Sequence, residues 1–316
     1  MVSPFSRRVR NMGGVANSTD PNWPSAASLL VSEPVEGRHN AALLGVHTFA
    51  NSLSPHSATS TPDAIRAALA RYSTWSFTDH VDLAEHVAAV DYGNVADPDG
   101  VDGDRRVAEA VGAFDGGLDF KIFLGGDNSV TWKAMRAVTG GDFTGYGLVT
   151  LDAHLDVRDG VSNGSPVRQL LEAGLDAKHV VQVGLADFSN SAPYAKRVHD
   201  AGTWVISRDS IRHGSIDEAA VRAVQLASVG GRKVYVDIDM DAADRAEVPG
   251  CSAAAPGGLS ADEMRRFVRI VATNAAVCAI DVTEIDVERD AIDQRTVRLG
   301  ALLVLEALAG LRRRLR

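Results

Sequence analysis

Cysteines and long hydrophobic runs are scarce in this sequence. Its 316 residues contain two cysteines, Cys251 and Cys278, and no Cys-x-x-C motif, which excludes a zinc knuckle or redox pair of that kind. Two scattered cysteines are typical of the reducing cytoplasm. No run of about 18 apolar residues is present, so we expect no transmembrane helix and no membrane partner. Arg7, Arg8 and Arg10 precede no apolar run, so we expect no signal peptide and a cytoplasmic location.

An excess of positive charge is also lacking. The chain carries 41 acidic and 32 basic residues, for a net charge of −9. A mildly acidic protein is a poor partner for the phosphate backbone of a nucleic acid. Hydrophobic residues make up 45% of the chain and charged residues 23%, which is ordinary for a globular protein with a substantial core. We therefore expect a small-molecule partner rather than a nucleic acid.

Short apolar runs alternate with helical patterns along most of the chain. Residues 1–38 are rich in Ser, Pro, Asn and Gly and predict an irregular N-terminal arm, followed by a single domain over residues 39–316. Most apolar runs are continuous, which indicates strands covered on both faces, as in a parallel sheet. The predicted strands are Ala41–Val46, Val87–Tyr92, Phe120–Leu124, Tyr146–Leu151, Val180–Leu185, Trp204–Ser207, Val234–Ile238 and Val277–Val282.

Helices are predicted between these strands. Alternating strands and helices imply right-handed crossovers and a three-layer αβα fold with a mostly parallel sheet of about eight strands. Ser260 and Glu263 have the form of a capping box. The predicted helices begin near Thr61 and cover Asp104–Phe114, Ser129–Ala137, Ser165–Ala173, Ser191–Ala201, Ile216–Ala227, Ser260–Val271 and Thr296–Arg314.

Polar clusters follow several of the predicted strands. In an open α/β sheet, ligands bind outside the carboxyl ends of the strands. Asp152, His154 and Asp156 alternate after one strand, and alternate side chains of an extended segment share a face. Carboxylates and imidazole together suit Mn, Fe, Ni or Zn better than Ca. A polar loop with helix caps is the alternative for this segment.

A second acidic segment follows another strand, at Asp237 and Asp239. These residues also share a face, and buried carboxylates this close repel one another unless a cation neutralises them. Neither acidic segment contains Lys or Arg, so two shared metal ions would satisfy both. Asp241 and Asp244 are interpreted as turn residues. Glu284 ends a further strand and is expected either to meet a cationic substrate group or to form a structural ion pair.

These motifs resemble those of the ureohydrolase superfamily, which contains arginase, agmatinase and formimidoylglutamase. The family pattern Gly-Gly-Asp-His-Ser appears here as Gly125–Ser129, Asp-Ala-His-x-Asp as Asp152–Asp156, and Asp-x-Asp-x-x-Asp as Asp237–Asp244 with Pro249-Gly250 behind it. The late Glu appears as Glu284. The resemblance runs from about Ala41 to Ala309 and implies an arginase-like fold and a hydrolase of linear amidine C–N bonds.

The resemblance also implies a role for each matching residue. Asp152 and Asp237 would bridge two Mn²⁺ ions, His154 and Asp239 would complete one site, and Asp156 would bind the other ion, with Ni or Zn as possible replacements. Asn128 stands at a sixth ligand position where most relatives have His. Its amide oxygen is a poorer ligand for a transition metal than imidazole is.

Within the superfamily the chain is most similar to formimidoylglutamase. Asn163 stands where arginase carries a proton-shuttling His, which argues against arginase proper. The implied reaction converts N-formimidoyl-L-glutamate and water to L-glutamate and formamide, in histidine degradation. Asp156 would transfer a proton and Glu284 would hold the cationic amidine. The substrate carboxylates would contact Arg158, Asn163, Ser189 and Asn190.

Two other functions stay open from the sequence. One is an agmatinase or guanidino-acid ureohydrolase, which releases urea rather than formamide. The other is a metal-poor, non-catalytic homologue, which only Asn128 supports. The resemblance further implies a homo-oligomer, a trimer or a hexamer.

Overall fold

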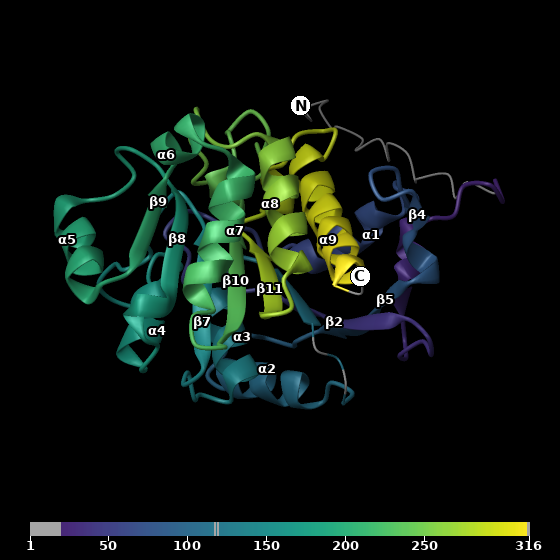
Figure 1. The fold of residues 1–316 in the computed structure, drawn as a ribbon, viewed down its shortest axis with the longest axis horizontal. Coiled ribbons are helices and arrows are strands. Elements are labelled where there is room, and N and C mark those ends of the chain that lie inside the picture. Colours follow the sequence, from purple (N-terminus) through teal and green to yellow (C-terminus); the bar gives the residue numbers. More distant parts are fainter. Residues whose placement is uncertain (1–19, 117, 119, 315–316) are drawn as a thin grey trace, which may run out of the picture.

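A nine-stranded parallel sheet forms the centre of the computed structural model, which describes residues 20–116, 118 and 120–314 (Figure 1). The strand order is β1-β5-β2-β6-β11-β10-β7-β8-β9, and each neighbouring pair is parallel. The strands are β1 (Leu30–Val31), β2 (His39–Val46), β5 (Val87–Asn94), β6 (Phe120–Gly125), β7 (Tyr146–Leu151), β8 (Val180–Leu185), β9 (Trp204–Ser207), β10 (Lys233–Asp239) and β11 (Val277–Thr283).

All eight predicted strands are present, and the prediction of a mostly parallel three-layer α/β fold is confirmed. The ninth strand, β1, pairs with β5 at one edge of the sheet, and a short 3-10 helix, η1 (Ala26–Leu29), precedes it. These two elements differ from the irregular arm expected there. The two-residue strand β1 is too short for hydrophobic periodicity to reveal it. Residues 1–19 of the predicted arm lie outside the described residues.

Helices cover both faces of the sheet (Figure 1). One layer contains α1, α7, α8 and α9, and the other contains α2, α3 and α4. A short helix that the sequence did not predict, α6, follows β9 directly. The helices are α1 (Thr61–Leu69), α2 (Gly103–Gly112), α3 (Ser129–Thr139), α4 (Pro166–Glu172), α5 (Ala192–Ala201), α6 (Arg208–His213), α7 (Ile216–Ala227), α8 (Ala261–Thr273) and α9 (Arg295–Arg313).

Two hydrophobic cores lie on opposite faces of the sheet. Strand β6 shows the division, because Ile122 and Leu124 pack into one core while Phe123 packs into the other. Successive strand side chains point to opposite faces, so a strand with both faces covered is apolar at every position. This explains why the continuous apolar runs predicted parallel strands correctly.

Helix α8 begins at the cap that the sequence predicts. The Ser260 side chain accepts from the backbone N–H of Glu263, and the Glu263 side chain accepts from the backbone N–H of Ser260, which confirms the predicted capping box at α8. A two-stranded antiparallel ribbon, β3 (Trp75–Ser76) and β4 (Val81–Asp82), lies apart from the main sheet. Among the described residues, no helix is long and apolar enough to cross a membrane.

Candidate metal centre and active site

Four neighbouring strands deliver the predicted site residues to one edge of the sheet. The strands β6, β11, β10 and β7 are adjacent and parallel, so their carboxyl ends lie side by side. Asn128 follows β6, Asp152 follows β7, Asp239 ends β10 and Glu284 follows β11. Residues up to 156 positions apart in the sequence are therefore in direct contact, as the hydrogen bond from the Asn128 backbone N–H to Glu284 Oε1 shows (2.8 Å).

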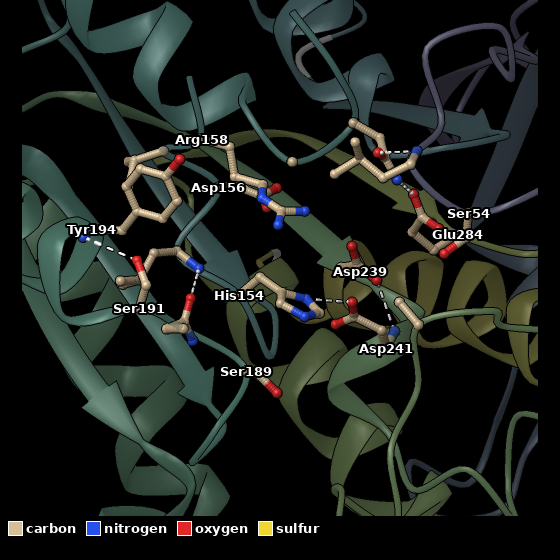
Figure 2. A pocket seen from close by; sticks show the side chains of 17 residues that line it. Ser54, His154, Asp156, Arg158, Ser189, Ser191, Tyr194, Asp239, Asp241 and Glu284 are labelled. Carbon is tan, nitrogen blue, oxygen red and sulfur yellow. Dashed lines mark hydrogen bonds and ion pairs between the residues drawn. The ribbon is translucent and has the colours of Figure 1, made fainter. Parts of the chain in front are cut away.

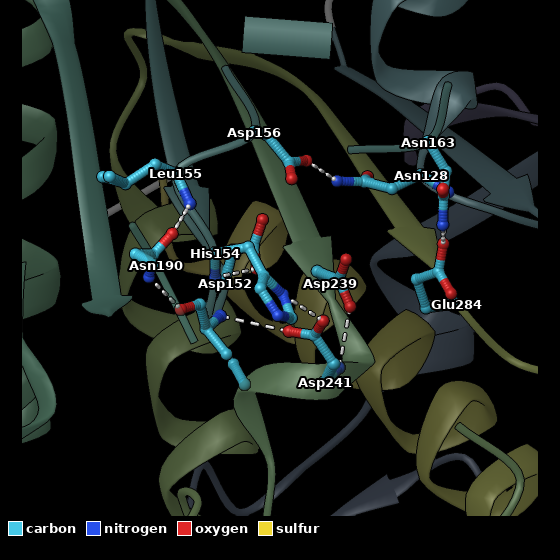
Figure 3. Close-up of polar contacts among 12 residues, drawn as sticks. Asn128, Asp152, His154, Leu155, Asp156, Asn163, Asn190, Asp239, Asp241 and Glu284 are labelled. Carbon is cyan, nitrogen blue, oxygen red and sulfur yellow. Dashed lines mark hydrogen bonds and ion pairs between the residues drawn. The ribbon is translucent and has the colours of Figure 1, made fainter. Parts of the chain in front are cut away.

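The tightest cluster consists of Asp152, His154 and Asp241 (Figure 3). Their possible ligand atoms lie within 4.8 Å of one another. His154 Nδ1 lies 2.7 Å from Asp241 Oδ2 and 3.5 Å from Asp152 Oδ1. The backbone holds both carboxylates, because Asp241 Oδ1 accepts from the N–H of Ala153 (3.0 Å) and Asp152 Oδ1 accepts from that of His154 (2.6 Å). Asp241, expected to be a turn residue, is therefore part of the acidic centre.

Asp237, expected to be a metal ligand, lies beside Asp281 and is not among the residues whose ligand atoms converge. It pairs in register with Asp281 on β11, is fully buried, and neither of its carboxylate oxygens receives a hydrogen bond. Burial, and then the charge of Asp281, raise the pKa of Asp237 well above its ordinary value. A protonated Asp237 can donate a hydrogen bond to Asp281, which also accepts from the hydroxyls of Tyr235 (2.8 Å) and Thr131 (3.0 Å). We therefore place Asp237 beside Asp281 rather than in the ligand set.

The chain direction after β10 explains this difference. The strand ends at Asp239, and the 3-10 turn η4 (Met240–Ala242) follows at once. In that turn the Asp239 side chain accepts from the backbone N–H of Asp241 (2.7 Å), and the Asp241 carboxylate meets His154. The alternation of side chains in a strand groups Asp237 with Asp239. It does not apply to Asp241, because Asp241 lies in the turn after the strand. The third Asp of the Asp-x-Asp-x-Asp repeat was the available signal in the sequence.

Asn128 presents its amide nitrogen, not its oxygen, to the site. Its Nδ2 donates to Asp156 Oδ2 (2.6 Å), while its Oδ1 accepts from the hydroxyls of Thr131 and Thr283, at 3.0 Å each. This network fixes which end of the amide faces Asp156. In this arrangement Asn128 donates a hydrogen bond to the Asp156 carboxylate, and its amide oxygen does not face the site as a metal ligand.

Asp156 and Glu284 share an unusual backbone conformation. Their φ angles are 52° and 63°, in the left-handed region that costs a side-chain-bearing residue about 1–3 kcal/mol. Glu284 is held by its own N–H, which donates to the carbonyl of Gly126 (2.7 Å), and by Asn163 Nδ2, which donates to its Oε1 (2.8 Å). Such strain persists only where surrounding contacts impose it, and here it orients the two predicted catalytic carboxylates.

The remaining predicted contacts line one cavity of about 270 Å³ (Figure 2). Arg158 reaches into it, and no described carboxylate pairs with its guanidinium group. A Cβ on Gly164 would lie 2.8 Å from Arg158 Cδ, so glycine leaves room for this side chain. Ser189 also lines the cavity. Tyr194 adds an aromatic side chain to the lining, which the sequence did not predict.

Asn163 and Asn190 line the same cavity but already have protein partners. Asn163 Oδ1 accepts from the backbone N–H of Leu53 (2.9 Å), while its Nδ2 holds Glu284. Asn190 Oδ1 accepts from the N–H of Leu155 (2.8 Å), and its Nδ2 donates to the carbonyl of Ala153 (3.0 Å). Both side chains therefore position the loops that carry the acidic residues, and the direct substrate contacts expected for them stay a prediction.

The acidic cluster strongly perturbs its own protonation. Burial, and then the charge of Asp241, raise the pKa of Asp152 to about 7. Burial, and then Asp152, raise the pKa of Asp156 well above its ordinary value, and burial with Asp241 does the same for Asp239. Burial alone would lower the pKa of His154, but Asp241 and Asp152 raise it to about 12. Buried carboxylates at this density require positive charge nearby to stay ionised.

The residues present fit a divalent metal. Asp152 Oδ2 is buried and receives no hydrogen bond from the described residues, so one lone-pair site of the cluster has no protein donor. Two carboxylates and an imidazole with converging ligand atoms are the donor set that Mn²⁺, Zn²⁺ and related ions prefer. Asp239 and Asp156 lie beside this cluster and line the same cavity. The site can therefore hold a cation that lets all these carboxylates ionise together.

A parallel α/β sheet with an Asp/His cluster at its carboxyl edge defines the class of this protein. The model of the arginase family matches residues 39–310, and the chain belongs to that family. It is 32% identical over 315 residues to the formimidoylglutamase of Halobacterium salinarum, covering 96% of this chain and 94% of the relative. It is 31% identical over 281 residues to that of Halalkalibacterium halodurans, covering 85% and 86%.

Solved structures of formimidoylglutamases share the fold. The Bacillus subtilis enzyme superposes with a TM-score of 0.84 at 27% identity, over 96% of this chain and 95% of that chain. A Trypanosoma cruzi formiminoglutamase with Mn²⁺ superposes with a TM-score of 0.82 at 23% identity, over 92% and 99%. At that identity the second likeness supports the fold alone.

The positions of Asp241 and Asp237 predict that the same substitution weakens Mn²⁺ binding to very different extents. Asp241→Asn should weaken Mn²⁺ binding by more than about 100-fold, because outer-shell changes alone cost about 10–100-fold. Asp237→Asn should weaken it less than about 10-fold, because Asp237 lies beside Asp281 and is not among the residues whose ligand atoms converge. Titration of each purified variant with Mn²⁺ measures both. Loss of binding in Asp237→Asn with retention in Asp241→Asn would restore the ligand set expected from the sequence.

The raised pKa values predict how the stability of the metal-free protein depends on pH. In the folded protein the pKa of Asp152 is raised to about 7 and that of Glu284 to about 8. In the unfolded chain the pKa of each group is near its ordinary value of about 4. Between these values the folded state holds more protons, so the free energy of unfolding should fall as pH rises. Thermal unfolding at about pH 5.5 and about pH 8.5, with and without Mn²⁺, tests this. A metal-free protein that is equally stable at both pH values contradicts it.

Proposed function

We propose that this chain hydrolyses N-formimidoyl-L-glutamate to L-glutamate and formamide. The curated formimidoylglutamases that it matches at 31–32% identity over most of both chains support this substrate. The single observation that carries the proposal is the unpaired Arg158 in the same cavity as Glu284 and the acidic cluster. A small cavity lined by one arginine and several carboxylates fits a small substrate that carries both a carboxylate and a cation.

Two oppositely charged groups of the cavity divide the recognition. The Glu284 carboxylate, fixed by Asn163 and by the Asn128 backbone, would receive the cationic formimino group. Burial, and then Asp127, raise the pKa of Glu284 to about 8, and an adjacent cation favours its ionised form. Arg158 would bind a glutamate carboxylate through its planar fork of N–H donors. Agmatine fits poorly, because its far end is an amine that Arg158 repels.

The metal ligands in this proposal are a revised set. Asp152, His154 and Asp241 would hold one Mn²⁺ ion, and Asp239 and Asp156 would hold a second together with Asp152. Bound divalent ions supply Lewis acidity and lower the pKa of a water molecule so that it becomes a nucleophile near neutral pH. Asn128 supports Asp156 through its N–H group, so this second position has one protein ligand fewer than a His at that place would give.

Asp156 has the features of a proton carrier. It is buried and lines the cavity, its pKa is raised, and its Oδ2 accepts a hydrogen bond from Asn128 Nδ2. It would hold the proton released when water attacks and deliver it to the departing glutamate nitrogen. Asn163 has no titratable group and so contributes by orienting Glu284. The proposal includes a role in histidine degradation, a cytoplasmic location and a homo-oligomeric state.

A product assay tests the substrate. The purified, Mn²⁺-loaded protein should release formamide from N-formimidoyl-L-glutamate, and should release little urea from agmatine, guanidinobutyrate or arginine. Guanidinobutyrate is the sharpest competitor, because it also carries a carboxylate for Arg158. Urea release exceeding formamide release would assign the chain to the guanidino-acid ureohydrolases. Absence of turnover on every amidine despite bound metal would support a non-catalytic homologue.

Arg158 is predicted to act on substrate binding. Arg158→Met should raise KM by about 10–100-fold, because a hydrogen bond to a charged group contributes about 1.5–3 kcal/mol, while kcat changes much less. Arg158→Lys should recover part of the loss, since it keeps the charge but not the fork. Steady-state kinetics with formimidoylglutamate give both constants. An unchanged KM in Arg158→Met would remove this residue from recognition.

A further inference from the structure

A buried arginine lies directly behind the acidic cluster. Arg208 is the first residue of α6, the short helix that follows β9, and it is 7% exposed. Its Nη2 donates to the backbone carbonyls of Asp241 and Ala242, at 3.0 Å each. The sequence alone gave no reason to connect Arg208 with residues more than 30 positions away, so both acidic segments seemed to lack a basic partner.

Arg208 does not form an ordinary ion pair. No described carboxylate is bonded to its guanidinium group, and its Nε–H is buried without a hydrogen-bond acceptor. Burial lowers the pKa of Arg208, and the charges of Asp241 and Asp152 oppose that shift. An arginine stays protonated in proteins. A permanent positive charge therefore sits within the field of two members of the metal cluster while its donors are used on the backbone.

The backbone that Arg208 holds is the turn η4, which joins β10 to the rest of the cluster. On the cluster side of this turn, Asp241 contacts His154 and the backbone of Ala153. On the opposite side, the two carbonyls point to Arg208. Buried carbonyls without a donor are unfavourable. Arg208 supplies a donor to the Asp241 carbonyl, and it adds a second donor to the Ala242 carbonyl, which also accepts from the backbone N–H of Leu259 (2.9 Å). The turn is thus fixed from both sides, and Asp241 with it.

We propose that Arg208 is a positioning residue of the metal centre: it clamps the turn Met240–Ala242 so that the Asp241 carboxylate meets Asp152 and His154. This inference rests on the proposed metal centre and not on the identity of the substrate. Two effects of Arg208 on a bound cation oppose each other. Its charge repels the cation, whereas its hydrogen bonds hold a ligand in place. Because the charge lies behind the backbone and the ligand makes direct contact, the positioning effect should dominate.

Three variants separate these effects. Arg208→Met removes both charge and donors, and Arg208→Lys keeps the charge but loses the planar fork. Arg212→Met is the matched control: Arg212 lies on the same helix and donates to one backbone carbonyl, that of Gly257 (2.9 Å), rather than to a carbonyl of the turn. Mn²⁺ binding is followed by the electron paramagnetic resonance signal of free Mn²⁺ at a temperature well below unfolding, with circular dichroism to confirm the fold.

We expect Arg208→Met to raise the Mn²⁺ dissociation constant by about 10–100-fold, as for other outer-shell changes. Arg208→Lys should raise it by less, about 3–10-fold, and Arg212→Met should leave it within about twofold. The KM for formimidoylglutamate, measured at saturating Mn²⁺, should stay near the wild-type value, because Arg208 is not among the described residues that line the cavity.

Unchanged or tighter Mn²⁺ binding in Arg208→Met would overturn the proposal, since charge repulsion would then outweigh positioning. If that variant does not fold, wild-type affinity in Arg208→Lys overturns it equally, because the lysine cannot reproduce the fork. Wild-type protein that binds Mn²⁺ but releases no formamide refutes the proposed substrate and leaves the Arg208 measurement valid. Wild-type protein that binds no Mn²⁺ refutes the metal centre and the role of Arg208 together.

Discussion

Repulsion among buried carboxylates is the constraint around which the active edge of this sheet is built. Four carboxylates of the site are at least 94% buried and interact electrostatically with one another: Asp152, Asp156, Asp239 and Asp241. Burial and neighbouring negative charge raise the pKa values of Asp152, Asp156 and Asp239, which favours their protonated forms where no cation is nearby. Charge of this density is unfavourable for folding alone. Its presence at the carboxyl ends of adjacent strands therefore indicates a site that a metal completes.

The chain supplies part of the positive charge itself, in two different ways. His154 faces the cluster, and its Nδ1 pairs with Asp241. Arg208 lies behind the turn and keeps its charge permanently, while its donors hold backbone carbonyls. Neither residue can neutralise all of the carboxylates. The positive charge of His154 depends on a proton that a metal ion can displace, whereas the charge of Arg208 is permanent, so neither residue blocks a metal ion from the cluster.

Hydrogen bonds link the metal centre to the substrate cavity through a few amide side chains. Asn128 joins Asp156 to the end of β6, and Asn163 joins Glu284 to the loop at Leu53. Asn190 holds the backbone on either side of His154. Amides suit this task because they donate and accept at once and carry no charge into an already acidic region. Arg158 stands outside these links, and its free guanidinium gives the cavity its one unpaired cation among the described residues.

The sequence by itself determined the sheet and most of the acidic centre. Continuous apolar runs require burial on both faces, so eight strands could be predicted, and strand ends located Asp152, His154, Asp156, Asp239 and Glu284. Short elements escaped, because β1 and α6 contain too few residues for periodicity to show. Only the tertiary structure decided that Asp241 rather than Asp237 meets His154, that Asn128 turns its nitrogen to Asp156, and that Arg208 lies behind the turn. Each of these depends on the exact direction of the chain after a strand ends and on partners distant in sequence, and neither is encoded in local pattern.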